Sequence, residues 1–252
     1  MNILQCEDIR KSFSGRTGIV KALDGVSLEI EKGSAFGLVG ESGCGKTTLG
    51  KIILGILKPD SGRITLKTKR VQVVFQDPYN SLDPKMKVFD ILAEGLLIRR
   101  VLCVVRRANE IKKQVEEILD LIKLSKDALN KYPHQFSGGE RQRIAIGRAL
   151  LTEPEFIVCD EPVSNLDVTI QLQILNLLKE SQKRFGITYL FVSHDLKVIK
   201  FICDKVAVMR HGRIIESGAV TDLYSAPKDH YTRSLLTSAF YDNMKHDGRD
   251  SL

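Results

Sequence analysis

The sequence predicts an α/β fold with a mostly parallel core sheet. Three short apolar runs, at residues 35–39, 156–159 and 188–192, have the continuous hydrophobicity of strands buried on both faces. Helical periodicity follows the first two runs and also fills a longer region at about 77–150. Strands that alternate with helices form a sheet covered by helices, and a ligand is expected at the carboxyl ends of the strands.

The first elements are predicted to be strand, turn, strand, loop and helix. Ser27–Ile30 alternates inward and outward residues, Lys32-Gly33 supplies a turn, and Ala35–Val39 ends at a glycine-rich loop. From Lys46 onward, apolar residues recur at spacings of three and four, which predicts a helix that ends before Pro59. The loop therefore connects a buried strand to a helix.

The remaining elements continue the alternation. Val71–Phe75 is β-rich, and the turn residues after it open the helical region at 77–150. A helix is expected at about 168–184, and two β-rich segments within 205–216 flank a His-Gly pair, which predicts a hairpin. Residues 241–252 are polar enough to form a disordered tail.

Composition excludes several classes of protein. The chain has 252 residues, is 43% hydrophobic and 27% charged, and carries a formal charge of +7, which excludes disordered and fibrous proteins. No apolar stretch approaches the roughly 18 residues that span a membrane, and no secretory signal begins the chain, so we expect it to stay in the cytosol. The basic excess suits phosphate, nucleic acid or an anionic membrane, but a solvated surface explains it equally well.

The cysteines indicate neither a disulfide framework nor a metal site. They are scattered, odd in number and without a CxxC pair, so we expect reduced thiols. They are Cys6, Cys44, Cys103, Cys159 and Cys203.

The glycine-rich loop matches G-x-x-x-x-G-K-[ST] between a predicted strand and a predicted helix. Its glycines let backbone N–H groups point into one concavity, Lys46 can bridge outer phosphates, and Thr47 can ligate Mg²⁺. A turn that only caps a helix is the alternative, but strand, spacing, lysine and threonine together favour a nucleotide. The predicted binding residues are Gly40, Glu41, Ser42, Gly43, Cys44, Gly45, Lys46, Thr47 and Thr48.

Two carboxylates follow the buried strand at 156–159. Asp160 can hold Mg²⁺, and Glu161 can orient or deprotonate an attacking water. The alternative is that both residues only begin a loop before Pro162. With the phosphate-binding loop present, we favour the catalytic interpretation.

Phe136–Arg143 resembles the signature segment of ATP-binding cassette (ABC) ATPases, because it lies about 90 residues after the phosphate loop and about 20 before Asp160. The resemblance covers nearly the whole chain. It implies a P-loop NTPase of the ABC ATPase type in a single domain, 1–240, with an N-terminal antiparallel β subdomain and the helical subdomain inserted at about 77–150. Ser137, Gly138, Gly139 and Glu140 would meet the γ-phosphate of a nucleotide held by the other subunit of a head-to-tail dimer, although a serine-capped helix is the alternative.

Four further positions match the family residue by residue. Gln76 resembles the Q-loop glutamine that reaches Mg²⁺, and Asp167 resembles the D-loop aspartate, although it can also cap the helix that follows. His194 resembles the switch histidine that contacts the γ-phosphate. Phe13 lies where the family stacks an aromatic ring on adenine, although it could equally belong to the core. The resemblance thus implies an ATPase with Glu161, His194, Lys46 and Gln76 as catalytic residues and Thr47, Gln76 and Asp160 as Mg²⁺ ligands.

Two segments are similar to the importer ATPases for oligopeptides, dipeptides or nickel, namely Val74–Pro84 and Tyr231–Leu236. One departure is Asp229-His230, where that subfamily has His-Pro. Ser164–Asp167 looks slightly more like the nickel or metallophore ATPases. The cargo therefore remains open between peptides and nickel or metal complexes.

The resemblance implies an ATP-hydrolysing subunit that lies peripherally on the cytoplasmic face of the plasma (inner) membrane. Its implied partners are two membrane-spanning permease subunits, a second ABC ATPase in a hetero- or homodimer, and, indirectly, an extracellular solute-binding protein, with no nucleic acid. The alternative is a soluble ABC ATPase that acts on nucleic acid or ribosomes, but such proteins usually carry coiled-coil insertions or two cassettes, which 252 residues do not accommodate. A regulatory subunit that hardly hydrolyses ATP is disfavoured by the presence of Glu161 and His194.

Overall fold

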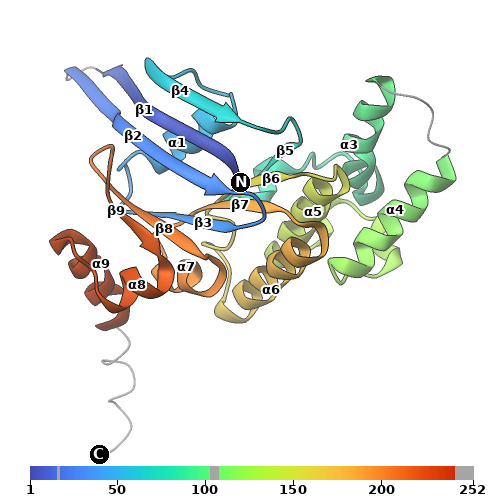
Figure 1. Cartoon of the computed structure of the whole chain (residues 1–252). Coiled ribbons are helices and arrows are strands. Elements are labelled where there is room, and N and C mark those ends of the chain that lie inside the picture. The colour runs from blue at the N-terminus through green and yellow to red at the C-terminus, as the bar shows by residue number, and fades with distance from the viewer. Residues whose placement is uncertain (16–17, 103–107, 242–252) are drawn as a thin grey trace, which may run out of the picture. The chain divides into compact units, whose positions relative to one another are not determined.

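The computed structural model describes residues 1–15, 18–102 and 108–241 (Figure 1). The chain divides into two compact units. The first unit consists of Met1–Lys69 together with the chain from Thr188 on, and the second consists of Arg70–Ile187.

The first unit contains a three-stranded antiparallel sheet. It is formed by β1 (Asn2–Gly15), β2 (Gly18–Glu31) and β4 (Ser61–Leu66), in the order β2-β1-β4. The antiparallel N-terminal sheet implied by the family resemblance is thus confirmed. β2 begins well before Ser27, where the sequence predicted the strand to start. The earlier residues were not predicted because the first of them are exposed and carry no hydrophobic alternation.

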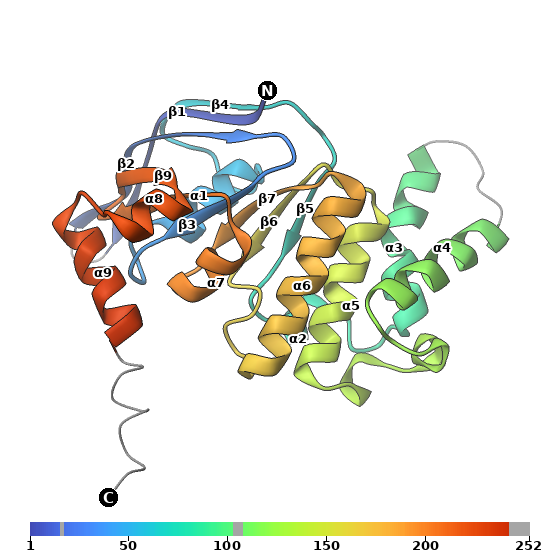
Figure 2. The same ribbon diagram turned by 60° about the horizontal axis from the view of Figure 1, so that its bottom comes forward.

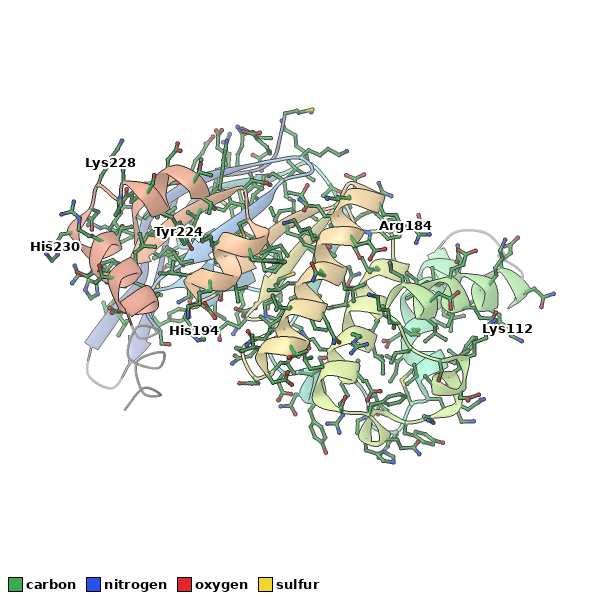
Figure 3. The ribbon with its side chains drawn as sticks, turned by 90° about the horizontal axis from the view of Figure 1, so that it is seen from below. Lys112, Arg184, His194, Tyr224, Lys228 and His230 are labelled. Carbon is green, nitrogen blue, oxygen red and sulfur yellow. The ribbon has the colours of Figure 1, made fainter. Side chains whose placement is uncertain are left out.

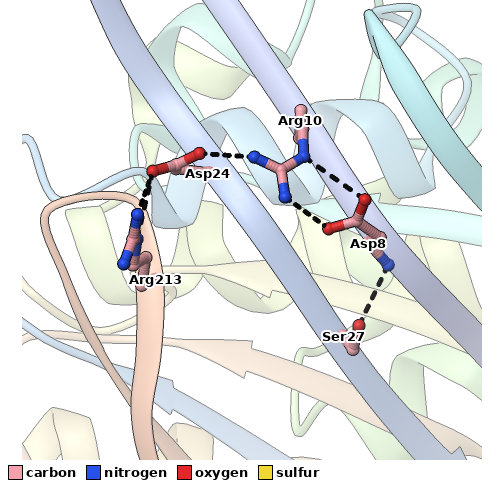
Figure 4. A network of polar contacts seen from close by, with 5 residues as sticks. All are labelled: Asp8, Arg10, Asp24, Ser27 and Arg213. Carbon is pink, nitrogen blue, oxygen red and sulfur yellow. Dashed lines mark hydrogen bonds and ion pairs between the residues drawn. The ribbon is translucent and has the colours of Figure 1, made fainter.

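A chain of ion pairs joins this sheet to β9 (Arg213–Ala219) (Figure 4). Arg10 contacts the Asp8 carboxylate at 2.9 Å and the Asp24 carboxylate at 2.8 Å, and Arg213 contacts Asp24 at 2.6 Å. The Asp24 side chain is only 12% exposed, so it is the enclosed centre of an otherwise exposed network.

The first unit also contains parallel strands. β3 (Ala35–Val39) pairs in parallel with β7 (Thr188–Val192) and with β8 (Lys205–Arg210), and β9 pairs antiparallel to β8. Every residue of β3 and β7 is buried, as expected for strands covered on both faces. The predicted mostly parallel core and the predicted hairpin are confirmed.

The described residues of the first unit form the helices α1 (Lys46–Ile53), α7 (Leu196–Ile202), α8 (Val220–Ser225) and α9 (His230–Tyr241) (Figures 1 and 2). The predicted extent of α1 was too long, because the helix stops at Ile53 rather than near Pro59. Gly55 has a φ of 72°, a left-handed conformation that ends the helix before the proline can do so.

The second unit pairs β5 (Val71–Val74) in parallel with β6 (Phe156–Asp160). Gly147 lets two helices approach closely, because a Cβ there would lie 3.0 Å from the Ile118 side chain. Figure 2 shows the last two helices of this unit side by side. Its helical elements are α2 (Pro78–Ser81), α3 (Val88–Leu102), α4 (Ala108–Leu121), η1 (Lys126–Asn130), η2 (Pro133–Gln135), α5 (Gly138–Leu151) and α6 (Val168–Phe185).

From Pro78 to Leu151 the described residues form helices and no strand, as the periodicity predicted. The boundaries of the inserted subdomain and of the single domain remain predictions. Among the helices of the described ranges, none is both long and apolar enough to cross a bilayer. Residues 242–252 of the predicted tail lie outside the described residues.

The described cysteines are free thiols, as expected, and Cys103 lies outside the described residues. Burial raises the pKa of Cys6 to about 12 and also raises the pKa of Cys159. These two thiols therefore stay protonated at neutral pH and are poor nucleophiles.

Candidate functional site

The glycine-rich loop connects β3 to α1 and packs closely against β2 and β8. Gly40 and Gly45 have φ values of 151° and 111°. A Cβ on Gly40 would lie 2.2 Å from the Met209 carbonyl oxygen, and one on Gly45 would lie 2.3 Å from the Ala22 carbonyl oxygen. Only glycine fits at these two positions, so the loop shape depends on them.

Lys46 points back into this loop. The residue is only 5% exposed. Its Nζ donates to the carbonyl oxygens of Gly40 at 2.7 Å and Glu41 at 2.9 Å. The N-cap residue of α1 is Gly45, which makes no side-chain capping bond, so the N–H groups of the first turn can bind an anion. A phosphate therefore fits this site, because it would accept from these N–H groups and offer Lys46 a charged acceptor.

Two distant segments contact the outside of the loop. Tyr231 of α9 accepts a hydrogen bond from the Glu41 backbone N–H at 3.2 Å, and Gly212 donates its N–H to the Cys44 carbonyl at 3.0 Å. From the sequence, Tyr231 had only a family match and no assigned role. Since 190 residues separate it from Glu41, no local pattern predicts the contact.

His194 lies at the same sheet edge as the loop. It follows β7, whose Val192 is paired with Leu38 of β3, and the Ser193 N–H donates to the Leu38 carbonyl at 3.1 Å. His194 is exposed (Figure 3), and the next residue, Asp195, caps α7 by accepting from the Lys197 N–H at 2.7 Å. The structure thus brings the predicted histidine to the edge where the loop begins.

Phe13 is not a core residue. Its exposed fraction is 43%, and the Lys11 ammonium lies 5.7 Å from the centre of its ring. The core alternative for Phe13 is therefore wrong, and its stacking on adenine remains a prediction.

In the second unit, Gln76 and Glu161 follow neighbouring parallel strands. Val74 of β5 is paired with Cys159 of β6, so both polar residues lie at the carboxyl edge of this pair. Asp160 and Glu161 are half-buried, and Glu161 has a φ of 49°, unusual for a residue with a side chain. Such backbone strain is common where a side chain is aimed at a reaction.

The signature segment begins α5 with a capping box. The Ser137 Oγ accepts from the Glu140 N–H at 3.3 Å, and the Glu140 carboxylate accepts from the Ser137 N–H and hydroxyl, both at 2.8 Å. The two bonds that the carboxylate accepts lower the pKa of Glu140, and the bond from the Ser137 N–H has the larger effect. Gly139 lets α6 approach, because a Cβ there would lie 2.5 Å from the Ile170 side chain. The serine cap and the anion site proposed for Ser137 therefore involve the same hydroxyl.

A cavity of about 160 Å³ in the second unit brings Gln76 together with the signature and D-loop segments. Its lining includes Gly138 and Leu166, and Asp167 next to it caps α6 by accepting from the Ile170 N–H at 3.0 Å. Gln142, which lies in the signature segment and had no predicted role, also lines this cavity; it is 1% exposed and donates to the Phe75 carbonyl at 3.3 Å.

The predicted site residues thus form two sets. The first unit holds the phosphate loop, Phe13 and His194, and the second holds Gln76, Asp160, Glu161, Ser137–Glu140 and Asp167. The predicted Mg²⁺ ligands are divided between the units, with Thr47 in the first and Gln76 and Asp160 in the second. Their joint coordination of Mg²⁺ remains a prediction.

Comparison with known proteins agrees with these motifs. The sequence model of the ABC transporter family matches residues 23–164. The oligopeptide transport ATP-binding protein OppF of Bacillus subtilis is 43% identical, with 94% of this chain and 82% of the relative covered. The dipeptide transport ATP-binding protein DppF of Haemophilus influenzae is 41% identical, with 91% and 74% covered.

Two solved structures are similar along most of their length. CbiO1 from Clostridium perfringens, part of the ABC transporter complex cbiONQ, has a TM-score of 0.77 and 28% identity, covering 97% of this chain and 98% of that one. A dimeric ATP-binding cassette in a post-hydrolysis state with ADP and Pi has a TM-score of 0.77 and 26% identity, covering 86% and 98%.

Proposed function

The chain belongs to the ABC transporter family, and from that premise we propose that it is the ATP-hydrolysing subunit of an importer for peptides. The observation that carries the cargo class is the similarity to two relatives named for oligopeptide and dipeptide transport, each covering more than nine-tenths of this chain. The nickel alternative, raised by Ser164–Asp167, is tested by the uptake experiment below.

ATP binds with its phosphates over the glycine-rich loop. Lys46 is already enclosed by the carbonyls of Gly40 and Glu41, so its ammonium is held close to the position where outer phosphates would lie. The backbone N–H groups at the start of α1, where the N-cap Gly45 has no side chain to occupy them, supply further donors. Phe13 presents an exposed ring that can stack on adenine.

Mg²⁺ would be held by Thr47, Gln76 and Asp160, and when bound it neutralises charge on the outer phosphates. The hydroxyl, amide and carboxylate oxygens of this set are the hard ligands that Mg²⁺ prefers. Glu161 accepts a proton from the attacking water, and His194 donates to the γ-phosphate. Phosphoryl transfer needs positioning and charge stabilisation more than covalent chemistry, and these side chains supply both.

Hydrolysis requires a second cassette, either a copy of this chain or a similar one. Ser137, Gly138, Gly139 and Glu140 of one subunit contact the γ-phosphate bound to the other, and Asp167 couples the two sites. The solved structure of a dimeric cassette with ADP and Pi supports the pairing of two cassettes. Residues 1–240 act as one cassette, with the helical subdomain at about 77–150.

The complete assembly also contains two membrane-spanning permease subunits and receives cargo from an extracellular solute-binding protein. The chain lies peripherally on the cytoplasmic face of the plasma membrane. Its relatives are named for transport, which disfavours the alternative of an ATPase acting on nucleic acid or ribosomes.

Purification of the tagged chain from detergent-solubilised native membranes, followed by mass spectrometry, tests this proposal. We expect two polytopic proteins, a second cassette and a solute-binding protein. Membrane vesicles that contain this assembly should take up a labelled peptide when ATP is supplied, and vesicles with Lys46→Ala should not. Recovery of ribosomes or DNA-repair proteins without a membrane subunit would contradict transport, and uptake of radioactive nickel without peptide uptake would change the cargo.

A further inference from the structure

One peptide group of the phosphate loop is held from both sides. The carbonyl of Gly40 accepts from the Lys46 ammonium at 2.7 Å, and the N–H of the same peptide, on Glu41, donates to the Tyr231 hydroxyl at 3.2 Å. Because a peptide group is planar and rigid, its orientation is shared by both hydrogen bonds. Tyr231 is therefore mechanically connected to Lys46 through a single peptide plane.

Tyr231 is itself held firmly. It is 8% exposed, and the Arg210 guanidinium lies 4.6 Å from the centre of its ring, at the end of β8. Burial raises the pKa of its hydroxyl, which therefore stays neutral at physiological pH and can both accept and donate. The ring thus fills a defined position between β8 and the phosphate loop.

The start of α9 is anchored to β9 by two carboxylates that accept backbone hydrogen bonds. The Asp229 carboxylate accepts from the Tyr231 N–H at 2.7 Å and so caps the helix. The Glu216 carboxylate of β9 accepts from the N–H groups of Lys228 at 2.9 Å and Asp229 at 3.1 Å. A continuous set of hydrogen bonds therefore leads from β9 through α9 to the loop.

We propose that Tyr231 is a positioning residue of the phosphate loop: through the Gly40–Glu41 peptide it keeps the Lys46 ammonium where the outer phosphates of ATP bind. This inference rests on the proposed nucleotide site. Tyr231 acts through the loop and not on the reacting atoms, so its loss weakens nucleotide binding and leaves the hydrolysis step nearly unchanged.

Isothermal titration of the purified full-length chain with Mg²⁺ and ADP tests the proposal. Tyr231→Phe keeps the ring and removes the hydroxyl, and we expect the Kd to rise about 3- to 10-fold, the effect of one lost neutral hydrogen bond. KM for ATP should rise by a similar factor while kcat changes less than about twofold. Arg210→Gln removes the cation that stacks on the Tyr231 ring and should also raise the Kd. The effects of Arg210→Gln and Tyr231→Phe on the Kd should be non-additive in the double variant.

Ser238→Ala is the matched control. Its hydroxyl lies on the same helix but donates to the Leu235 carbonyl at 2.9 Å, so its removal should leave the Kd unchanged. Arg210 is exposed, so Arg210→Gln is expected to fold even if Tyr231→Phe does not.

Two results would overturn the inference alone: a wild-type Kd in both Tyr231→Phe and Arg210→Gln, or a loss of kcat with unchanged Kd and KM. Absence of ADP binding by the wild-type chain, or equal binding by Lys46→Ala, would instead overturn the proposed function and this inference with it. The two failures are therefore distinguishable in the same titration.

Discussion

Substitutions of Ser137 should separate two roles of one hydroxyl. In the structure, this hydroxyl caps α5, because it accepts from the Glu140 N–H and donates to the Glu140 carboxylate. In the proposed dimer, it also contacts a γ-phosphate. Asparagine caps a helix as well as serine does but has no hydroxyl. Alanine has neither a capping group nor a hydroxyl. Ser137→Asn should therefore remove only the phosphate contact, and Ser137→Ala should remove both.

The stability cost of Ser137→Ala follows from the capping geometry. The variant loses the 3.3 Å and 2.8 Å bonds of the hydroxyl but keeps the backbone bond from its own N–H to Glu140. Ser137 is exposed, so water replaces part of the loss, and the cost is about 1 kcal/mol of unfolding free energy. For a chain of this size, this lowers Tm by about 2–4 °C. Ser137→Asn should cost less than about 0.5 kcal/mol.

Urea unfolding followed by circular dichroism measures the first role, and ATPase activity of the assembled transporter measures the second. Both variants should lose at least about tenfold in ATPase rate. Ser125→Ala is the control, because Ser125 precedes η1 without a side-chain capping bond, and this change should leave stability unchanged. Wild-type ATPase activity in Ser137→Asn would refute the phosphate role, and wild-type stability in Ser137→Ala would refute the capping argument.

Three further predictions test other parts of the molecule. Lys46→Ala should abolish ATP binding measured by titration calorimetry, because it removes the ammonium enclosed by the loop; retained tight affinity would contradict the phosphate-loop assignment. Glu161→Gln should bind ATP normally but hydrolyse it about 10²- to 10⁴-fold more slowly in a phosphate-release assay, and a wild-type rate would exclude Glu161 as the base. Asp24→Asn should lower stability at neutral pH, because the hydrogen bond from Arg213 lowers the pKa of Asp24 below its ordinary value of 3.8, and the charged form is the one stabilised. The difference from wild type in urea midpoint should persist above that value and disappear as the pH falls through the lowered pKa; a pH-independent difference would exclude this origin.

The elements predicted best from the sequence are those whose signals are local. β3 and β7 have the predicted bounds, because each is a continuous apolar run with a turn residue or loop at its end. The hydrophobic pattern does not predict β1, since its pairing with β2 shifts register between Cys6 and Ile9 and interrupts the alternation. β4 is also hidden, because none of its residues is fully buried.

For the candidate site, the sequence alone determined the nucleotide chemistry. The Gly40–Thr47 loop, the Asp160-Glu161 pair and the Ser137 cap each depend on backbone within a few residues, so residue type and spacing suffice to identify them. Only the tertiary structure decided that the Glu41 N–H meets Tyr231, 190 residues away. That contact depends on how β8, β9 and α9 pack against the loop, and long-range packing leaves no periodic pattern in the chain.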